Sequence, residues 1–324
     1  MNILIVGGAG YVGGALTNIL LTTEHHILVY DLLLYEETYR KNVPFVYGDI
    51  RDHKKLQPHL DWADVVIWLA ALVGDPACSL NAELTEEINT QSVQYLRDNF
   101  KGRIIFMSTC SVYGAAENML TEESSLNPLS LYAKTKLQSE TILKDTNSVV
   151  LRLGTLYGVS DAFSRIRFDL VVNTLCMRAF MHGRISVFGG QQYRPLLHVR
   201  DVAAFIAQSL LSIKPGLYNL HSENLVINDI AEQMKRHFPQ LNIEKSQTMF
   251  QDNRNYRVSS QKAVTQAHFT PKLTVEDGIV ELKQLLEEGR IKDSFLNRFS
   301  NYLYLRPLLS EYDSPLGKML KFNL

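Results

Sequence analysis

Short apolar runs alternate with amphipathic stretches through the first half of the chain. The apolar runs have the length of buried strands, and the stretches between them carry apolar residues at helical spacing. Uninterrupted apolar strands that alternate with helices predict a parallel sheet covered by helices on both faces. The predicted strands cover 3–6, 27–30, 45–47, 65–69, 104–107 and 149–153, and the predicted helices cover 12–21, 54–60, 85–100 and 130–143.

The rhythm changes in the second half, where the predicted elements are shorter and more widely spaced. They are too scattered for an independent second domain, so we predict a smaller cap on a doubly wound, Rossmann-type α/β fold. In such a fold the ligand crevice lies at the carboxyl ends of the strands. The later elements are helices at 168–181, 227–238 and 275–288 and strands at 185–188 and 218–220.

Three regions follow from this pattern. We expect residues 1–160, with return segments near 185–212, to form the dinucleotide-binding domain. Residues 161–290 should form most of a substrate-binding cap. Residues 291–324 are rich in Leu, Tyr and Phe. They are too apolar for a free linker, so we expect this tail to pack on the body or on a partner.

Composition narrows the class of protein. The chain has 324 residues, enough for a substantial core, and a formal net charge of −1, which predicts neither a nucleic-acid nor a membrane partner. Its three cysteines lack metal-ligand spacing, which predicts free thiols, a reducing compartment and no metal site. The first strand begins without a leader, and the longest apolar stretch, 65–74, is too short to span a bilayer. We therefore expect a cytoplasmic protein.

A glycine motif links the first predicted strand to the first predicted helix. The spacing of Gly7, Gly10 and Gly13 allows a tight turn, a close approach of the backbone to a pyrophosphate, and tight packing of the helix on the strand. The helix N-terminus stabilises the phosphate charge. The motif predicts a dinucleotide site that includes Tyr11 and Val12; a plain glycine turn is the alternative.

Acidic residues follow the second and third strands. Asp31 can accept both ribose hydroxyls of an adenosine and would repel a 2′-phosphate, and no Arg or Lys follows at 32–34. This favours NAD over NADP, with a solvated turn aspartate as the alternative. Asp49 and Ile50 could cover the adenine ring, and Asp49 could also cap the next helix.

Tyr132 and Lys136 form a Tyr-x-x-x-Lys pair near the start of a predicted helix. Residues four apart share one helix face, and an ammonium beside a phenol lowers the phenol pKa. Tyr132 can then take a proton from a hydroxyl as hydride leaves the carbon, and Lys136 can hydrogen-bond the nicotinamide ribose. A hydroxyl-rich turn at 108–114 ends the preceding strand, so these groups should meet at the carboxyl edge of the sheet.

Taken in order, these motifs resemble the extended short-chain dehydrogenase/reductases, and specifically the NAD-dependent nucleotide-sugar epimerase/dehydratase group. The resemblance covers about residues 2–288. It is carried by Gly7-x-x-Gly10-x-x-Gly13, Leu69-Ala70-Ala71, Ser108-Thr109-x-x-Val112-Tyr113-Gly114, Tyr132-x-x-x-Lys136, Arg152-Leu153-x-x-x-Tyr157-Gly158 and Arg194-Pro195-x-x-His198-Val199-x-Asp201-Val202-Ala203.

The resemblance implies roles for individual residues. Thr109 would hydrogen-bond the reacting oxygen, and Val73 would lie in the loop that lines the sugar pocket. The family also implies a homodimer, formed largely by the helix that carries Tyr132 and the helix before it. The implied cofactor contacts further include Leu69, Ala70 and Ala71.

On the substrate side, the resemblance implies that Arg194 binds the diphosphate of a nucleotide sugar, a task that suits a planar guanidinium. Asn173 matches a family asparagine near the same diphosphate, and Arg254 is a third candidate contact. His198 and Asp201 lie in a motif that we interpret as structural, bracing the cap against the sheet.

Departures from the family bear on the reaction. The 4,6-dehydratases carry Asp and Glu after the catalytic Thr, where this chain has Cys110 and Ser111, so water elimination lacks its acid–base pair. In the GDP-fucose synthase branch a Cys and a His epimerise carbons beside a ketone. Cys110 has no matching His here, so we interpret it as a spacer thiol of the substrate pocket. Stretches 70–78 and 167–173 resemble a subgroup that oxidises C4 of GDP-heptoses in bacterial capsule synthesis.

The predicted function is NAD-dependent oxidation and reduction at C4 of a nucleotide-activated sugar. The enzyme would be a 4-epimerase or a C4 dehydrogenase in the synthesis of bacterial surface-polysaccharide sugars. A 4-keto reductase is an open alternative, as is a non-catalytic NAD-binding interaction protein. A dehydrogenase of a small substrate without a nucleotide is a further rival, but it would have little use for Arg194.

Overall fold

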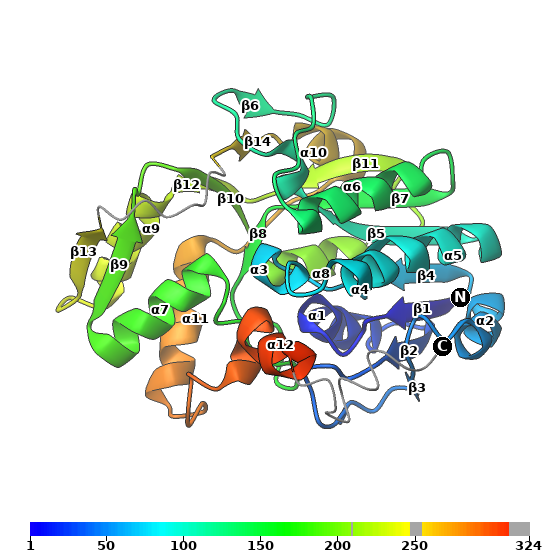
Figure 1. The fold of residues 1–324 in the computed structure, drawn as a ribbon, viewed down its shortest axis with the longest axis horizontal. Coiled ribbons are helices and arrows are strands. Elements are labelled where there is room, and N and C mark those ends of the chain that lie inside the picture. Colours follow the sequence, from blue (N-terminus) through cyan, green and yellow to red (C-terminus); the bar gives the residue numbers. More distant parts are fainter. Residues whose placement is uncertain (209, 247–254, 311–324) are drawn as a thin grey trace.

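The computed structural model describes residues 1–208, 210–246 and 255–310 (Figure 1). The predicted substrate contact Arg254 and the end of the predicted tail, 311–324, lie outside the described residues. Within the described chain, no helix has both the length and the apolar character needed to cross a bilayer.

A seven-stranded sheet forms the centre of the molecule, with the order β11-β7-β5-β4-β1-β2-β3. Every neighbouring pair in it is parallel, which confirms the doubly wound fold. Strand order reverses between β1 and β4, and such a switch point is where ligands bind. The strands are β1 (Asn2–Val6), β2 (His26–Asp31), β3 (Phe45–Tyr47), β4 (Val65–Trp68), β5 (Arg103–Thr109), β7 (Ser148–Leu153) and β11 (Gly216–Leu220).

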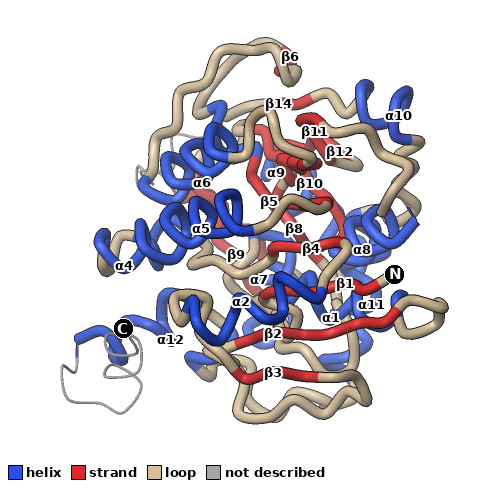
Figure 2. The backbone as a smooth tube through the Cα atoms, turned by 90° about the vertical axis from the view of Figure 1, so that its right-hand side faces the viewer, coloured by secondary structure: helices blue, strands red, loops and turns tan. Residues whose placement is uncertain are grey.

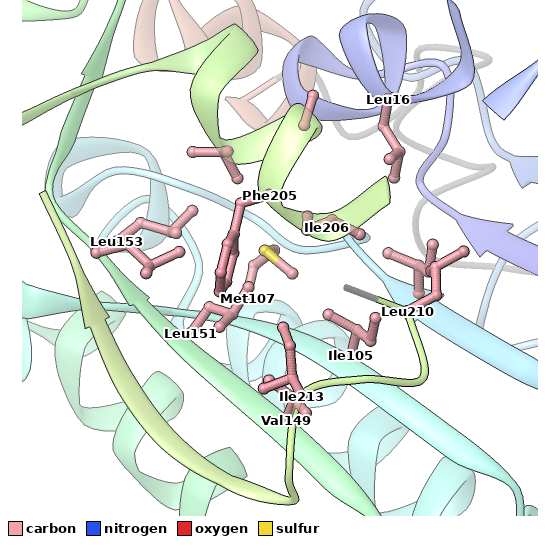
Figure 3. Packing of buried hydrophobic residues seen from close by; sticks show 14 of the residues in the cluster. Leu16, Ile105, Met107, Val149, Leu151, Leu153, Phe205, Ile206, Leu210 and Ile213 are labelled. Carbon is pink, nitrogen blue, oxygen red and sulfur yellow. The ribbon is translucent and has the colours of Figure 1, made fainter. Parts of the chain in front are cut away.

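Helices cover both faces of this sheet, as the turned view shows (Figure 2). On one face Leu16 of α1 and Phe205 of α8 pack with Ile105 and Val149 from the strands in a continuous apolar cluster (Figure 3). On the other face Leu96 and other apolar residues fill a second cluster. The covering helices are α1 (Tyr11–Leu20), α8 (Val199–Gln208) and α10 (Gln261–Ala267) on the first face, and α2 (His53–Trp62), α5 (Ser92–Asn99) and α6 (Leu131–Ile142) on the second.

The single helix predicted over 85–100 is three elements: α4 (Ala82–Glu86), a π-helical turn (Glu87–Gln91) and α5. The π turn directs Asn89 into the protein, where its amide accepts a hydrogen bond from Leu72 N at 2.8 Å and donates to Leu72 O at 3.0 Å. Asn89 therefore fixes the backbone that follows β4. A short helix, α3 (Asp75–Cys78), comes next in that loop.

The cap has its own apolar cluster. Strand β10 pairs in parallel with β8 and antiparallel with β12, and β9 pairs in parallel with β13. The predicted strand at 185–188 thus belongs to a separate small sheet, whereas β11 lies in the central sheet. The cap elements are β8 (Thr155–Tyr157), α7 (Val171–His182), β9 (Arg184–Phe188), β10 (Tyr193–His198), β12 (Glu223–Val226), α9 (Ile227–His237), β13 (Asn242–Ser246) and α11 (Val275–Glu287), and a further small pair joins β6 (Met119–Leu120) to β14 (Arg257–Val258).

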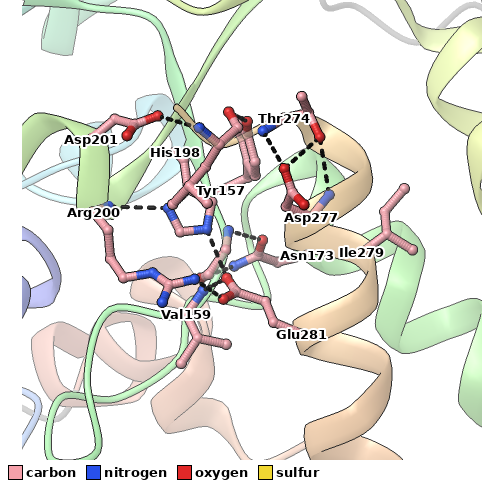
Figure 4. A network of polar contacts seen from close by, with 12 residues as sticks. Tyr157, Val159, Asn173, His198, Arg200, Asp201, Thr274, Asp277, Ile279 and Glu281 are labelled. Carbon is pink, nitrogen blue, oxygen red and sulfur yellow. Dashed lines mark hydrogen bonds and ion pairs between the residues drawn. The ribbon is translucent and has the colours of Figure 1, made fainter. Parts of the chain in front are cut away.

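A polar network ties the cap to the sheet (Figure 4). His198 Nδ1 accepts a hydrogen bond from Arg200 N at 3.1 Å, so Nε2 carries the proton and donates to Glu281 Oε1 at 2.7 Å. Asp201 Oδ2 accepts from the backbone N–H of Lys272 and Leu273 at 3.1 and 3.0 Å. Asp201, on α8, thus connects a helix on the sheet to the segment before α11, whereas His198 connects β10 to α11 within the cap.

The described part of the tail packs on the body of the molecule. A 3₁₀ turn (Asn297–Phe299) leads into α12 (Asn301–Ser310), which lies beside α3. Leu305 is completely buried in the second apolar cluster, and the Tyr304 ring lies 5.4 Å from that of Tyr35. The described part of the tail therefore belongs to the folded core.

Candidate active site

A cavity of about 930 Å³ opens at the carboxyl ends of the central strands. This volume is at the upper end of what a small-molecule site needs. The predicted cofactor residues all line it, as do the predicted catalytic residues and two of the predicted substrate residues. They are Gly7, Gly10, Tyr11, Val12, Gly13, Asp31, Asp49, Ile50, Leu69, Ala70, Ala71, Val73, Thr109, Tyr132, Lys136 and Arg194.

The glycine turn forms one wall of this cavity. Gly7 has a φ of +84°, and a Cβ there would lie 2.5 Å from Ala70 N. A Cβ on Gly13 would lie 2.4 Å from Gly8 O, so only glycine lets α1 pack this closely on the turn. Gly10 caps α1 and is exposed, which leaves the helix N-terminus open to a phosphate group. The cradle fits a dinucleotide pyrophosphate.

Asp31 ends β2 with both carboxylate oxygens oriented by the backbone. Oδ2 accepts a hydrogen bond from Ala9 N at 2.9 Å, and Oδ1 accepts from Leu33 N at 2.7 Å. Burial raises the pKa of Asp31, and these backbone hydrogen bonds oppose that rise. Each oxygen keeps a further lone pair, so the carboxylate is prepared to receive ribose hydroxyls.

The Asp49 side chain is held by a buried ion pair. Its Oδ2 lies 2.6 Å from the Arg51 guanidinium, which also lies 3.3 Å from Glu87. The expectation that Asp49 might cap the next helix is wrong, because Asp52 caps α2 by accepting from Lys55 N at 3.1 Å. Asp49 still lines the cavity beside Ile50.

Three elements bring the predicted catalytic side chains together. Thr109 ends β5, and its hydroxyl accepts from Ser111 N at 3.1 Å at the start of a 3₁₀ turn (Cys110–Tyr113). Tyr132 and Lys136 lie on the first turns of α6, where Ser130 is the N-cap. Lys136 Nζ donates to Met107 O at 2.9 Å, which fixes the position of the ammonium.

The protonation states differ from the expectation. Burial raises the pKa of Tyr132, Cys78 and Asp75 raise it further, and Arg167 and Thr109 oppose the rise. Burial also lowers the pKa of Lys136 to about 8. The expected lowering of the Tyr132 pKa is therefore not seen in the protein alone, because desolvation of the phenol outweighs the groups that oppose the rise.

Arg194 lies on β10 and is almost entirely buried, yet its side chain lines the cavity. It donates to Tyr193 O at 2.9 Å. Tyr256 also lines this end and lies 3.4 Å from the Ser111 hydroxyl. This end of the cavity therefore combines a cation with hydroxyl groups, as an anionic sugar nucleotide requires.

Two predicted substrate residues lie outside the cavity lining. Asn173 is completely buried; it accepts from Gly158 N at 2.9 Å, and its amide nitrogen contacts Gly158 O and the Tyr11 hydroxyl. Cys110 is also fully buried, its thiol donates to Arg152 O at 3.2 Å, and burial raises its pKa. The predicted substrate contacts of both residues are corrected to packing roles, because their polar atoms already have partners inside the protein.

Comparison with known proteins identifies the family. Residues 3–220 match the model of the NAD dependent epimerase/dehydratase family. The chain belongs to this family. NAD is accordingly its cofactor, as the sequence predicted, and the cradle described above fits it.

Relatives in this family catalyse several reactions. The N-acetyl-alpha-D-glucosaminyl-diphospho-ditrans,octacis-undecaprenol 4-epimerase of Escherichia coli O157:H7 is 23% identical over 75% of each chain. The dTDP-glucose 4,6-dehydratase of Streptomyces niveus is 25% identical over 90% of this chain and 94% of the relative. The UDP-glucuronic acid 4-epimerase of Bacillus cereus, solved with UDP-glucuronic acid and NAD, shares the fold with a TM-score of 0.74, 23% identity, and coverage of 89% of this chain and 99% of that one.

Sequence reasoning missed several side chains of the family site. Arg165 and Arg167 lie in the loop before α7, Arg178 lies on α7, and the tail contributes Asn301 and Tyr302. Only the dense charge of 165–169 was a local signal for any of them. The others reach the cavity through tertiary packing, which a linear pattern does not record.

Proposed function

We propose that the protein catalyses NAD-dependent oxidation and reduction at C4 of a nucleotide-activated sugar, as a 4-epimerase or a C4 dehydrogenase. The product would serve the synthesis of bacterial surface polysaccharides. One observation carries this proposal: Thr109, Tyr132 and Lys136 line the same cavity as the glycine turn and Arg194. A proton carrier, a dinucleotide cradle and a phosphate-binding cation thus share one space.

Each side chain would have a separate role in the reaction. Bound NAD supplies the hydride acceptor and donor. Tyr132 would exchange a proton with the C4 oxygen, Thr109 would hydrogen-bond the same oxygen, and Lys136 would hydrogen-bond the cofactor ribose. Arg194 would hold the substrate diphosphate.

The raised pKa of Tyr132 defines its resting state. In the protein alone the phenol is neutral at physiological pH, which suits it to donate a proton to a keto oxygen. To accept a proton from a C4 hydroxyl, it must first be ionised. The positive charge of an oxidised nicotinamide and of Lys136 would favour that form.

The surroundings of Thr109 argue against a dehydratase. Cys110 is buried, and Ser111 presents a hydroxyl in place of a carboxylate. Loss of water from C5 and C6 needs an acid and a base at those positions. A 4-keto-6-deoxy sugar should therefore not accumulate.

The decisive experiment is to incubate the purified protein with UDP-, GDP-, CDP- and dTDP-sugars and to analyse products by mass spectrometry and NMR. A 4-epimerase leaves the mass unchanged and inverts C4. A C4 dehydrogenase removes two hydrogens, and a 4-keto reductase adds two to a keto sugar. Loss of water, or no turnover of any sugar despite NAD binding, would contradict the proposal; the latter result would favour a non-catalytic interaction protein.

A further inference from the structure

Two arginines face the cavity from the loop between β8 and α7. Arg167 is almost entirely buried and donates to both Asp169 oxygens, at 2.6 and 3.0 Å. Arg165 donates to Arg298 O at 2.9 Å and to Asn301 Oδ1, and its guanidinium lies 3.9 Å above the Tyr35 ring. Within the described chain, no carboxylate lies within ion-pair distance of Arg165.

This loop runs along the start of α1. The Ser160 hydroxyl accepts from Ala15 N at 3.0 Å, and the Tyr11 hydroxyl donates to Gly158 O. A Cβ on Gly14 would overlap the Ser164 hydroxyl, so loop and helix are in direct contact. Arg165 follows Ser164 directly. Both arginines line the same cavity as the glycine turn.

The two positive charges repel each other. Burial and the charge of Arg167 lower the pKa of Arg165 to about 10. Asp169 is paired with Arg167, and Glu36 is paired with Arg298 at 2.8 Å, so these two carboxylates offset only part of the charge of Arg165. Since partly buried like charges are costly, an anion between Arg165 and the glycine turn would relieve the repulsion.

The tail holds this arrangement in place. Asn301 N donates to Asp169 Oδ2 at 2.8 Å, its Nδ2 donates to Val73 O at 2.7 Å, and its Oδ1 accepts from Arg165. One residue thus connects the sugar-pocket loop with both arginines.

We propose that Arg165 and Arg167 form a second wall of the NAD pyrophosphate site, opposite the glycine turn, and that Asn301 is the positioning residue for both. We assign the two arginines to the cofactor and not to the substrate diphosphate because Arg165 stacks on Tyr35. Tyr35 follows Asp31 closely in the chain, and Asp31 is the predicted contact of the adenosine ribose. Arg194, the candidate for the substrate diphosphate, approaches from β10.

The test is calorimetric titration of the full chain with NAD and, separately, with UDP. Arg165→Gln should weaken NAD binding at least about tenfold, because it removes charge-assisted hydrogen bonds, and should leave UDP binding unchanged. It should also flatten the dependence of NAD affinity on salt. Arg184→Gln, an exposed site on β9 outside the cavity, is the matched control and should change neither affinity.

Asn301→Ala should weaken NAD binding several-fold but keep the wild-type salt dependence, because both charges remain. Asn301→Asp keeps the acceptor for Arg165 but adds a negative charge beside it and loses the donor to Val73 O, so it should bind NAD no better than Asn301→Ala. The proposal is overturned if folded Arg165→Gln binds NAD as wild type does, or if it loses UDP affinity alone. Should Arg165→Gln fail to fold, Arg167→Gln undergoes the same titrations with the same expected and contrary results.

Discussion

Tyr132 is the residue on which the proposed chemistry depends. Phe at this position keeps the ring and its packing but cannot exchange a proton. General acid–base groups contribute about 10²- to 10⁴-fold, so Tyr132→Phe should lower turnover at least about a hundredfold and leave NAD binding nearly intact. Steady-state rates on an identified nucleotide sugar, together with NAD titration, measure both effects.

Two neighbouring variants serve as controls for Tyr132. Thr109→Val removes a hydrogen bond but not the proton carrier, so it should cost less turnover. Lys136→Ala should weaken NAD binding as well as turnover, because this lysine is placed to serve both the phenol and the ribose. A Tyr132→Phe protein within a few-fold of the wild-type rate would rule out the proposed role.

At the residue scale, we expect Asp31 to determine the choice between dinucleotides. Its carboxylate is fixed by backbone N–H groups of Ala9 and Leu33, and a 2′-phosphate would meet that charge directly. NAD should therefore bind more tightly than NADP. Asp31→Ala should weaken NAD binding and narrow the difference in affinity between NAD and NADP. Titration of both dinucleotides measures this, and equal binding by the wild type would refute it.

His221 is half-buried in its neutral form. Its Nε2 lies 2.8 Å from Asn224 Nδ2, and that amide is fixed because it also donates to Val258 O and accepts from Val258 N. A protonated imidazole would place a donor against this donor. Burial accordingly lowers the pKa of His221 to about 4.

Stability should follow from this shift. Unfolded histidine takes up a proton near pH 6.5, whereas folded His221 does so near 4, so the unfolded chain binds more protons between these values. The free energy of unfolding should fall as pH drops from about 6.5 to about 4, by up to about 3 kcal/mol from this group. Urea unfolding at several pH values measures how steeply the free energy of unfolding changes with pH, which is the slope in question. His221→Gln should reduce it, and an unchanged slope would count against this account.

At the scale of elements, the π turn before α5 is connected to the site through Asn89. Asn89→Ala would leave both backbone groups of Leu72 without partners, at a cost of about 1–3 kcal/mol in the free energy of unfolding. It should also lower turnover, since Leu72 lines the cavity. Gln94 is exposed on α5, so Gln94→Ala is the control. Its free energy of unfolding should stay within about 0.5 kcal/mol of the wild-type value. Equal effects of the two substitutions in urea unfolding would contradict this role.

Elements with a strong local pattern were predictable from the sequence. Buried strands such as β4 and β5 contain continuous apolar runs, and the spacing of the glycines predicts the tight turn between β1 and α1. The π turn was not predictable, because it shifts the helical pattern by a single residue over one turn, which is too short a change to recognise in the apolar spacing. Asn173 was misassigned since nothing in its neighbourhood shows that Gly158 and Tyr11 would claim its amide.

At the scale of the whole molecule, the central sheet and the assembly of the catalytic residues followed from the sequence, but the closing of the cavity did not. Asn301 reaches Val73 and Asp169 across long separations in the chain, and only tertiary packing creates such contacts. The raised pKa of Tyr132 has the same origin, because burial is a property of the folded chain.

The family resemblance also predicts a homodimer through α5 and α6. Their outward positions include Gln94, Lys134 and Gln138, so the interface would be polar. Light scattering should give twice the chain mass. Gln138→Trp should shift the measured mass toward that of the monomer, because the larger side chain would not fit in the dimer interface. A monomeric wild-type protein at micromolar concentration would exclude the dimer.

Strand β11 has a consequence for the order in which the chain folds. It pairs with β7 only after the intervening residues 154–215 have passed through the cap and back. Closing so long a loop is slow, and until it closes β7 is an open edge of apolar strand. Mutations that delay cap folding should therefore act as aggregation mutations, because exposed β7 edges from two chains can pair with each other.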